Sequence, residues 1–253
     1  MQLRNPLFKN MENDGAYDYE KSDCTTVKGV FGKTLILVGV AILAAVLAIA
    51  FMYNLTEDNI GQFVGLLIGS LFVALIAGLI ATFSVTLCPI FSFIYAAAEG
   101  FLLGVISLLV ELYYPGVAIC AVIATFAVTL VMGVLYFTGV IKVGHKLKAF
   151  VLTGLIALVL AGVISAILAA VGFMGMHDAL YGDSPLAWIV AVFGVIIASL
   201  SLCIDFDYAA NLADGGAPKK YEWKAGFVLT SSIIYLYLRL LELFVRIAAA
   251  SKK

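Results

Sequence analysis

The chain has 253 residues, of which 64% are hydrophobic and only 12% are charged. A soluble domain carries about 25% charged residues, so the surplus of apolar side chains must face lipid. The formal net charge of −1 provides no basic surface for nucleic acid. These values exclude a soluble globular domain and indicate an integral membrane protein.

Seven apolar runs follow one another along the chain. Each is long enough to cross about 30 Å of hydrocarbon at about 1.5 Å per helical residue. A lipid-exposed backbone must satisfy its own hydrogen bonds, so each run is predicted to be a helix and the fold to be all-α. The predicted spans are residues 34–53, 61–84, 91–112, 117–138, 149–172, 186–206 and 225–248. They give a transmembrane domain over 34–248, between a polar N-terminal tail (1–33) and a short C-terminal tail (249–253).

Lysine and arginine predict the orientation of these spans. None occurs between Thr34 and Ile141, whereas they gather in the N-terminal tail and in the links after the fourth and sixth spans. Basic segments stay in the cytoplasm, so the N-terminus is predicted to be cytoplasmic. The C-terminal tail then ends outside, with Lys252 and Lys253 against the rule, unless one run does not fully cross.

Signatures of enzymes and of bound metals are missing from the sequence. The four cysteines have no paired spacing, and the two histidines, His145 and His177, fall in loops on opposite sides of the membrane. No serine–histidine–aspartate set, phosphate loop or dinucleotide fingerprint occurs. We therefore expect no enzymatic activity, no resident metal and no cofactor.

Small residues mark faces where helices approach closely. Gly61, Gly65 and Gly69 recur every four residues on the second span, and Gly100 and Gly104 do so on the third. In lipid, such faces allow backbones to pack tightly. We expect both sets to lie at helix contacts.

Glu99 is a charged residue well inside the third span. A charge at the centre of a span costs roughly 2.5–3.5 kcal/mol, so such residues have a function or a partner. Ser92, Tyr95 and Glu99 share one helical face. Two interpretations stay open, a proton or cation site and a carboxylate hydrogen-bonded for packing. Glu111, beside a tight turn, is expected to be a solvated helix end.

The sixth and seventh spans carry the other intramembrane charges. Asp205 and Asp207 point about 200° apart on a helix, so only one can face a central pore. Asp205 is predicted to be a titratable pore carboxylate, and Asp207 to pair with a lysine of the following link, Lys219 or Lys220. On the last span, Arg239, Glu242 and Arg246 have spacings that allow them to neutralise each other along the helix. Alternatively, Arg239, near mid-span, pairs with Asp205 or Glu99 on a facing helix.

Several short motifs, in this order, resemble the transmembrane Bax inhibitor motif family in its bacterial branch. They are Asn5-Pro6-Leu7-Phe8, Thr26 to Thr34, Tyr95 to Gly100, Asp205-Phe206-Asp207-Tyr208, Gly216-Ala217-Pro218 with Glu222-Trp223, and Tyr235-Leu236-Tyr237-Leu238.

The resemblance implies a seven-helix fold with the seventh helix enclosed by the other six, in a bacterial plasma membrane. It also implies a pH-sensitive calcium leak in which acids on the sixth and seventh helices share protons. Asp205 matches the first acid, but Arg239 stands at the position of the second. Either Glu242, one turn further, takes over that role, or the calcium function is lost. An Asp205–Arg239 salt bridge would instead resist mild acid.

Two functions are therefore expected from the sequence. The first is a pH-sensitive cation channel of the calcium-leak kind, gated by intramembrane carboxylates, with calcium bound only in transit. The alternative is a non-conducting regulator that binds membrane proteases or other membrane complexes. A proton-coupled carrier ranks last, because no substrate pocket is recognisable. The expected partners are the lipid bilayer, cations and other membrane proteins.

Overall fold

The protein folds into an all-helical bundle, seen in a computed structural model that describes residues 24–54, 60–172, 175–176, 180, 182 and 184–251. All of its long helices in this part of the chain are apolar enough to cross a membrane, which confirms the predicted seven spans. The helices are α2 (Val27–Tyr53), α3 (Ile60–Phe83), α4 (Cys88–Tyr113), α5 (Val117–Phe137), α6 (His145–Ala170), α8 (Pro185–Asp214) and α9 (Tyr221–Ser251).

Several helices are longer than the apolar runs from which they were predicted. Thr26 caps α2, because its side chain accepts the Gly29 N–H, and the helix begins at Val27 instead of Thr34. Ser184 caps α8 in the same way, immediately before Pro185. Both α8 and α9 continue into polar sequence. Caps, and not the loss of hydrophobicity, therefore decide where these helices begin.

Some sequence predictions fall outside the described residues. They include the first 23 positions of the N-terminal tail, with the motif Asn5-Pro6-Leu7-Phe8, the loop histidine His177, and the last two lysines.

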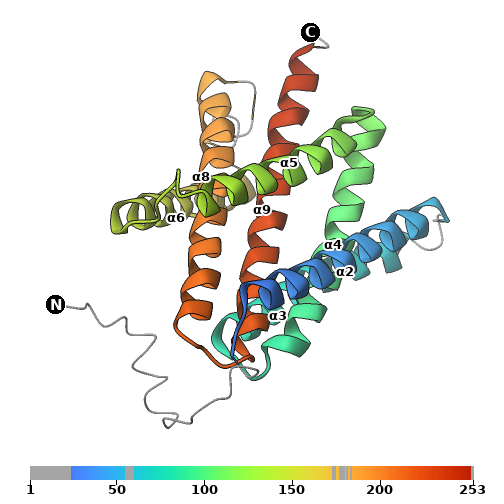
Figure 1. The fold of residues 1–253 in the computed structure, drawn as a ribbon. Helices are drawn as coiled ribbons and strands as arrows, with labels where there is room; N and C mark the ends of the chain where they lie inside the picture. The colour runs from blue at the N-terminus through green and yellow to red at the C-terminus, as the bar shows by residue number, and fades with distance from the viewer. Residues whose placement is uncertain are drawn as a thin grey trace.

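The last two helices form the centre of the arrangement (Figure 1). Helices α8 and α9 run antiparallel and side by side, and α9 also contacts α2, α3, α4 and α5. Helix α6 packs on α8 alone, and no Cα atoms of α6 and α9 lie within 8 Å of each other. The expectation that the last helix is enclosed by all six others is therefore not confirmed.

The paired glycines of α4 lie at a close helix contact, whereas Gly61, Gly65 and Gly69 of α3 do not. A Cβ added to Gly100 would lie 2.2 Å from the Ala41 carbonyl oxygen of α2, and one on Gly104 would lie 2.4 Å from that of Ala45. The prediction is confirmed for these two glycines. It is wrong for the small-residue face on α3, because nothing lies within 4 Å of a Cβ added at positions 61, 65 or 69.

The largest core lies between α8 and α9. Leu202 and Leu229 are fully or almost fully buried in it, together with Leu236 and Phe206. Cys203 is buried in the same core, and all four cysteines are free thiols. This core surrounds the one aspartate that we expected to face the interior.

Candidate functional site

Asp205 lies in the last part of α8 and points into the apolar core against α9. It is 9% exposed, and its Oδ2 atom is buried with no hydrogen-bond partner among the described residues. The hydroxyl of Ser232, on α9, lies close to the carboxylate. An ionised carboxylate in apolar surroundings is expensive without a counter-ion or water. Asp205 is therefore a buried intramembrane acid without a counter-ion among the described residues.

Asp207 points to another side of α8, as its spacing from Asp205 predicted. Its Oδ2 atom lies 2.7 Å from Lys148 Nζ of α6, and the Tyr136 hydroxyl is 3.5 Å from its Oδ1 atom. The predicted pairing with a lysine was correct in kind but wrong in partner, because Lys148, and not Lys219 or Lys220, takes that place. Asp207 is thus a partly exposed surface acid.

Arg239 does not reach Asp205. Its Nε donates to the Tyr235 hydroxyl at 3.0 Å, and its Nη1 donates to Glu242 Oε2 at 2.9 Å. Its side chain packs against Gly194 of α8, where an added Cβ would lie 3.1 Å from Arg239 Cδ. Gly194 precedes Asp205 by 11 residues, which is about 16 Å along the helix. The predicted Asp205–Arg239 pair is therefore wrong.

Glu242 is held by two arginines of its own helix. Besides Arg239, it accepts from Arg246 Nη2 at 3.2 Å, and Arg246 also donates to the carbonyl oxygens of Leu180 and Gly182. The alternating ladder along α9 was one of the two sequence interpretations, and it is the one that forms. Glu242 consequently cannot serve as a second acid beside Asp205.

Glu99 stands apart from the other intramembrane charges. It is half-buried on α4, and Tyr95, one turn earlier, packs edge-on against Phe227 of α9 with ring centroids 5.1 Å apart. No Cα atoms of α4 and α8 lie within 8 Å, so Glu99 and Asp205 do not meet. The structure therefore brings Glu99, Asp205 and Arg239 into no common cluster.

Glu111 is not simply a solvated helix end, as was expected. Its Oε1 atom accepts the N–H of Gly116 at 2.6 Å, and Gly116 has a φ of +86°. The Oε2 atom is buried and has no partner in the described part of the chain. Glu111 thus fixes the turn between α4 and α5.

Sequence reasoning missed a buried ionic cluster formed by Thr26, Lys33 and Glu222, here called the Glu222 cluster. Glu222, at the start of α9, is 1% exposed and forms an ion pair with Lys33 of α2. Its Oε1 atom also accepts the backbone N–H of Thr26 at 3.0 Å and the Thr26 hydroxyl at 3.1 Å. Next to it, the Thr25 N–H donates to the Ala217 carbonyl at 2.7 Å. The beginning of α2 is thereby tied to the α8–α9 link.

Gly29 was the one feature of the sequence that could have indicated this cluster. A Cβ at that position would lie 2.1 Å from Glu222 Oε1, so only glycine leaves room for the carboxylate. The motifs around Thr26 and Glu222 were recognisable one by one. Nothing in their sequence showed that they meet.

The described residues contain no group of three or more histidine, cysteine, aspartate or glutamate side chains that could hold a metal ion. Calcium prefers six to eight oxygen ligands. No cluster of acidic side chains that could provide several of these ligands is seen among the described residues.

These features define a multi-pass helical membrane protein with a buried acid between its last two helices. A family model described as Bax inhibitor 1 like matches residues 5–249, nearly the whole chain. The chain therefore belongs to the Bax inhibitor 1-like family, as its motifs indicated. No curated protein matches the chain.

Proposed function

We propose that this protein is a pH-modulated cation leak of the calcium-leak kind, in which Asp205 is the titrating group. The observation that supports the proposal is the Asp205 carboxylate itself. It is buried between α8 and α9 near the Ser232 hydroxyl, and one of its oxygens has no hydrogen-bond partner among the described residues.

The two protonation states of this carboxylate favour different packings of α8 and α9. A protonated Asp205 is neutral, so it fits the apolar core beside the Ser232 hydroxyl. An ionised Asp205 requires water or a cation in the same place. Water and cations would then enter between the two helices as the aspartate loses its proton, and cation flux would rise with pH.

Arg239 and Glu242 affect this mechanism by staying away from Asp205. Because the guanidinium of Arg239 is directed at Glu242, it is not directed at Asp205. Because Glu242 is shared with Arg246, it does not form a proton-sharing acid pair with Asp205 either. The proposed sensor is therefore a single acid and not the pair of acids that the resemblance implies.

We further propose that the end of the bundle where α8 meets α9 faces the cytoplasm. Lys33, Lys148 and Lys220 lie towards this end, and so do Lys219 and Lys224. Basic residues favour the cytoplasmic side. Asp205 would then lie near the inner mouth of the leak.

Calcium entry into vesicles tests the proposal. The purified protein is reconstituted into liposomes that contain a calcium-sensitive dye, and entry is measured at several pH values. Asp205→Asn should hold the flux at its low-pH level at every pH, because asparagine is a neutral analogue of the protonated acid. Asp207→Asn is the matched control and should keep the pH dependence of the wild type.

Two results would overturn the proposal. Wild-type protein that admits no calcium at any pH would reject the leak and leave the non-conducting regulator as the remaining interpretation. An Asp205→Asn variant with an unchanged pH profile would reject Asp205 as the sensor.

A further inference from the structure

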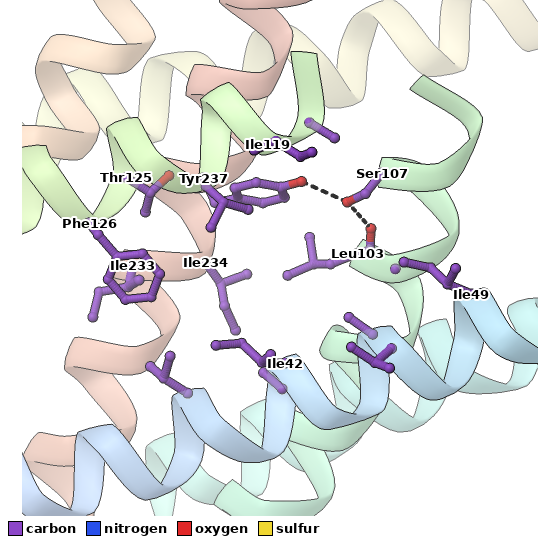
Figure 2. A pocket seen from close by; sticks show the side chains of 17 residues that line it. Ile42, Ile49, Leu103, Ser107, Ile119, Thr125, Phe126, Ile233, Ile234 and Tyr237 are labelled. Carbon is purple, nitrogen blue, oxygen red and sulfur yellow. Dashed lines mark hydrogen bonds between the residues drawn. The ribbon is translucent and has the colours of Figure 1, made fainter. Parts of the chain in front are cut away.

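An apolar cleft of about 320 Å³ opens between α2 and α5. Helices α4 and α9 form its floor, with Leu103 and Ile234 among the lining residues, and Figure 2 shows these side chains facing the same space. Small-molecule sites span about 300–1,000 Å³, so the cleft is large enough for part of a ligand. It is separate from Asp205, which lies against another face of α9.

The polar groups of the cleft are already hydrogen-bonded to the protein. The Tyr237 and Ser107 hydroxyl oxygens lie 2.6 Å apart, and Ser107 also donates to the Leu103 carbonyl (Figure 2). Thr125 donates to the carbonyl oxygen of Ala121 at 2.7 Å. No charged side chain lines the cleft. Its chemistry is therefore complementary to an uncharged hydrocarbon chain and to no ion or polar headgroup.

The mouth of the cleft faces the hydrocarbon of the membrane. Ile42, Val46 and Ile119 line it and remain 49%, 57% and 62% exposed. All three belong to helices that cross the membrane. The molecules that reach this opening are therefore lipid tails.

The helices on either side cannot close the cleft. No Cα atoms of α2 and α5 lie within 8 Å of each other, although both helices contact α4 and α9. The close contacts of Gly100 and Gly104 with Ala41 and Ala45 fix α2 on α4. An empty space of this size would deprive its lining of dispersion contacts, so an occupant from the bilayer stabilises the arrangement.

We propose that one phospholipid acyl chain occupies this cleft as a bound, stoichiometric lipid. The tail lies between α2 and α5 against Ile234 and Tyr237, and its headgroup stays outside the cleft. This proposal does not depend on the cation leak, because neither Asp205 nor Ser232 lines the cleft.

Native mass spectrometry of the protein extracted from bilayers of a single phosphatidylcholine tests the proposal. One phospholipid should remain bound per chain after exchange into a mild detergent. Ala45→Phe places a ring in the cleft and should remove this lipid. Leu43→Phe adds the same ring at a position of α2 that is 66% exposed and does not line the cleft, so it should retain the lipid.

A second matched pair decides the test if the first cannot be purified. Val122→Trp fills the cleft from α5, whereas Ile123→Trp, one residue away, adds the ring outside it. Loss of the lipid in Val122→Trp alone supports the proposal. Retention in both variants, loss in both, no bound lipid in the wild type, or a dimer mass in place of the lipid would each overturn it.

Discussion

The Glu222 cluster predicts that a single charge on α2 carries a large share of the stability. The Glu222 side chain is 2% exposed and that of Lys33 is 16% exposed. Lys33→Met would leave the carboxylate buried with only the two hydrogen bonds from Thr26. Removing one partner of a buried ion pair costs about 3–5 kcal/mol. We therefore expect Lys33→Met to lower the free energy of unfolding by about that amount.

Two comparisons isolate the cause of this loss. The double variant Lys33→Met/Glu222→Gln removes both charges, so it should be more stable than Lys33→Met alone. Lys148→Met breaks the exposed pair with Asp207, in which the lysine is 48% exposed. Exposed pairs contribute about 0–1 kcal/mol, so this control should change little.

Reversible unfolding of the four proteins in detergent micelles, followed by circular dichroism, measures these differences. Lys33→Met should separate from Lys148→Met by about 2 kcal/mol or more. Equal and small losses in both variants would refute the reasoning. So would a double variant that is no more stable than Lys33→Met alone, because the unpaired buried charge would then not be the cause of the loss.

Three further predictions concern packing and hydrogen bonding within the bundle. Gly104→Val should lower the free energy of unfolding by several kcal/mol, because the new Cβ meets the α2 backbone. Gly65→Val should be tolerated, because nothing lies near its Cβ. Equal unfolding temperatures of the two variants would contradict this prediction. Glu242→Gln should destabilise the fold more than Arg239→Gln, because the first change leaves two part-buried arginines without their carboxylate. The opposite order of the two variants in denaturant unfolding would refute this prediction. Tyr237→Phe removes one hydroxyl pair and should cost about 1 kcal/mol in the same assay, and a loss above 3 kcal/mol would show a larger role.

Hydropathy was sufficient to find the membrane spans, because lipid demands long apolar helices. It could not find the true ends of α2, α8 and α9, since these ends are set by capping side chains and by packing beyond the hydrocarbon. It also could not tell which glycines pack. Gly65 and Gly104 have the same spacing pattern, but only Gly104 faces a neighbouring backbone.

The candidate site was predictable one helix at a time. The opposite directions of Asp205 and Asp207 and the ladder on α9 follow from spacing along a helix. The pairing of α8 with α9 does not, because their register depends on the length of the link and on packing. That register sets Asp205 against Ser232 and Gly194 against Arg239.

The Glu222 cluster was beyond sequence reasoning for a similar reason. Its ion pair joins residues 189 positions apart in the chain. A lysine and a glutamate near the ends of two apolar runs ordinarily indicate solvated termini. Only the three-dimensional contact between α2 and α9 shows that the glutamate is buried.

The most direct test of this account compares the pH profiles of calcium entry for Asp205→Asn and Arg239→Gln in the same liposomes. The account assigns pH sensing to Asp205 and leaves Arg239 in a separate ion pair with Glu242. It predicts a flat profile for Asp205→Asn and a profile like the wild type for Arg239→Gln. A flat profile for Arg239→Gln together with a normal one for Asp205→Asn would contradict it.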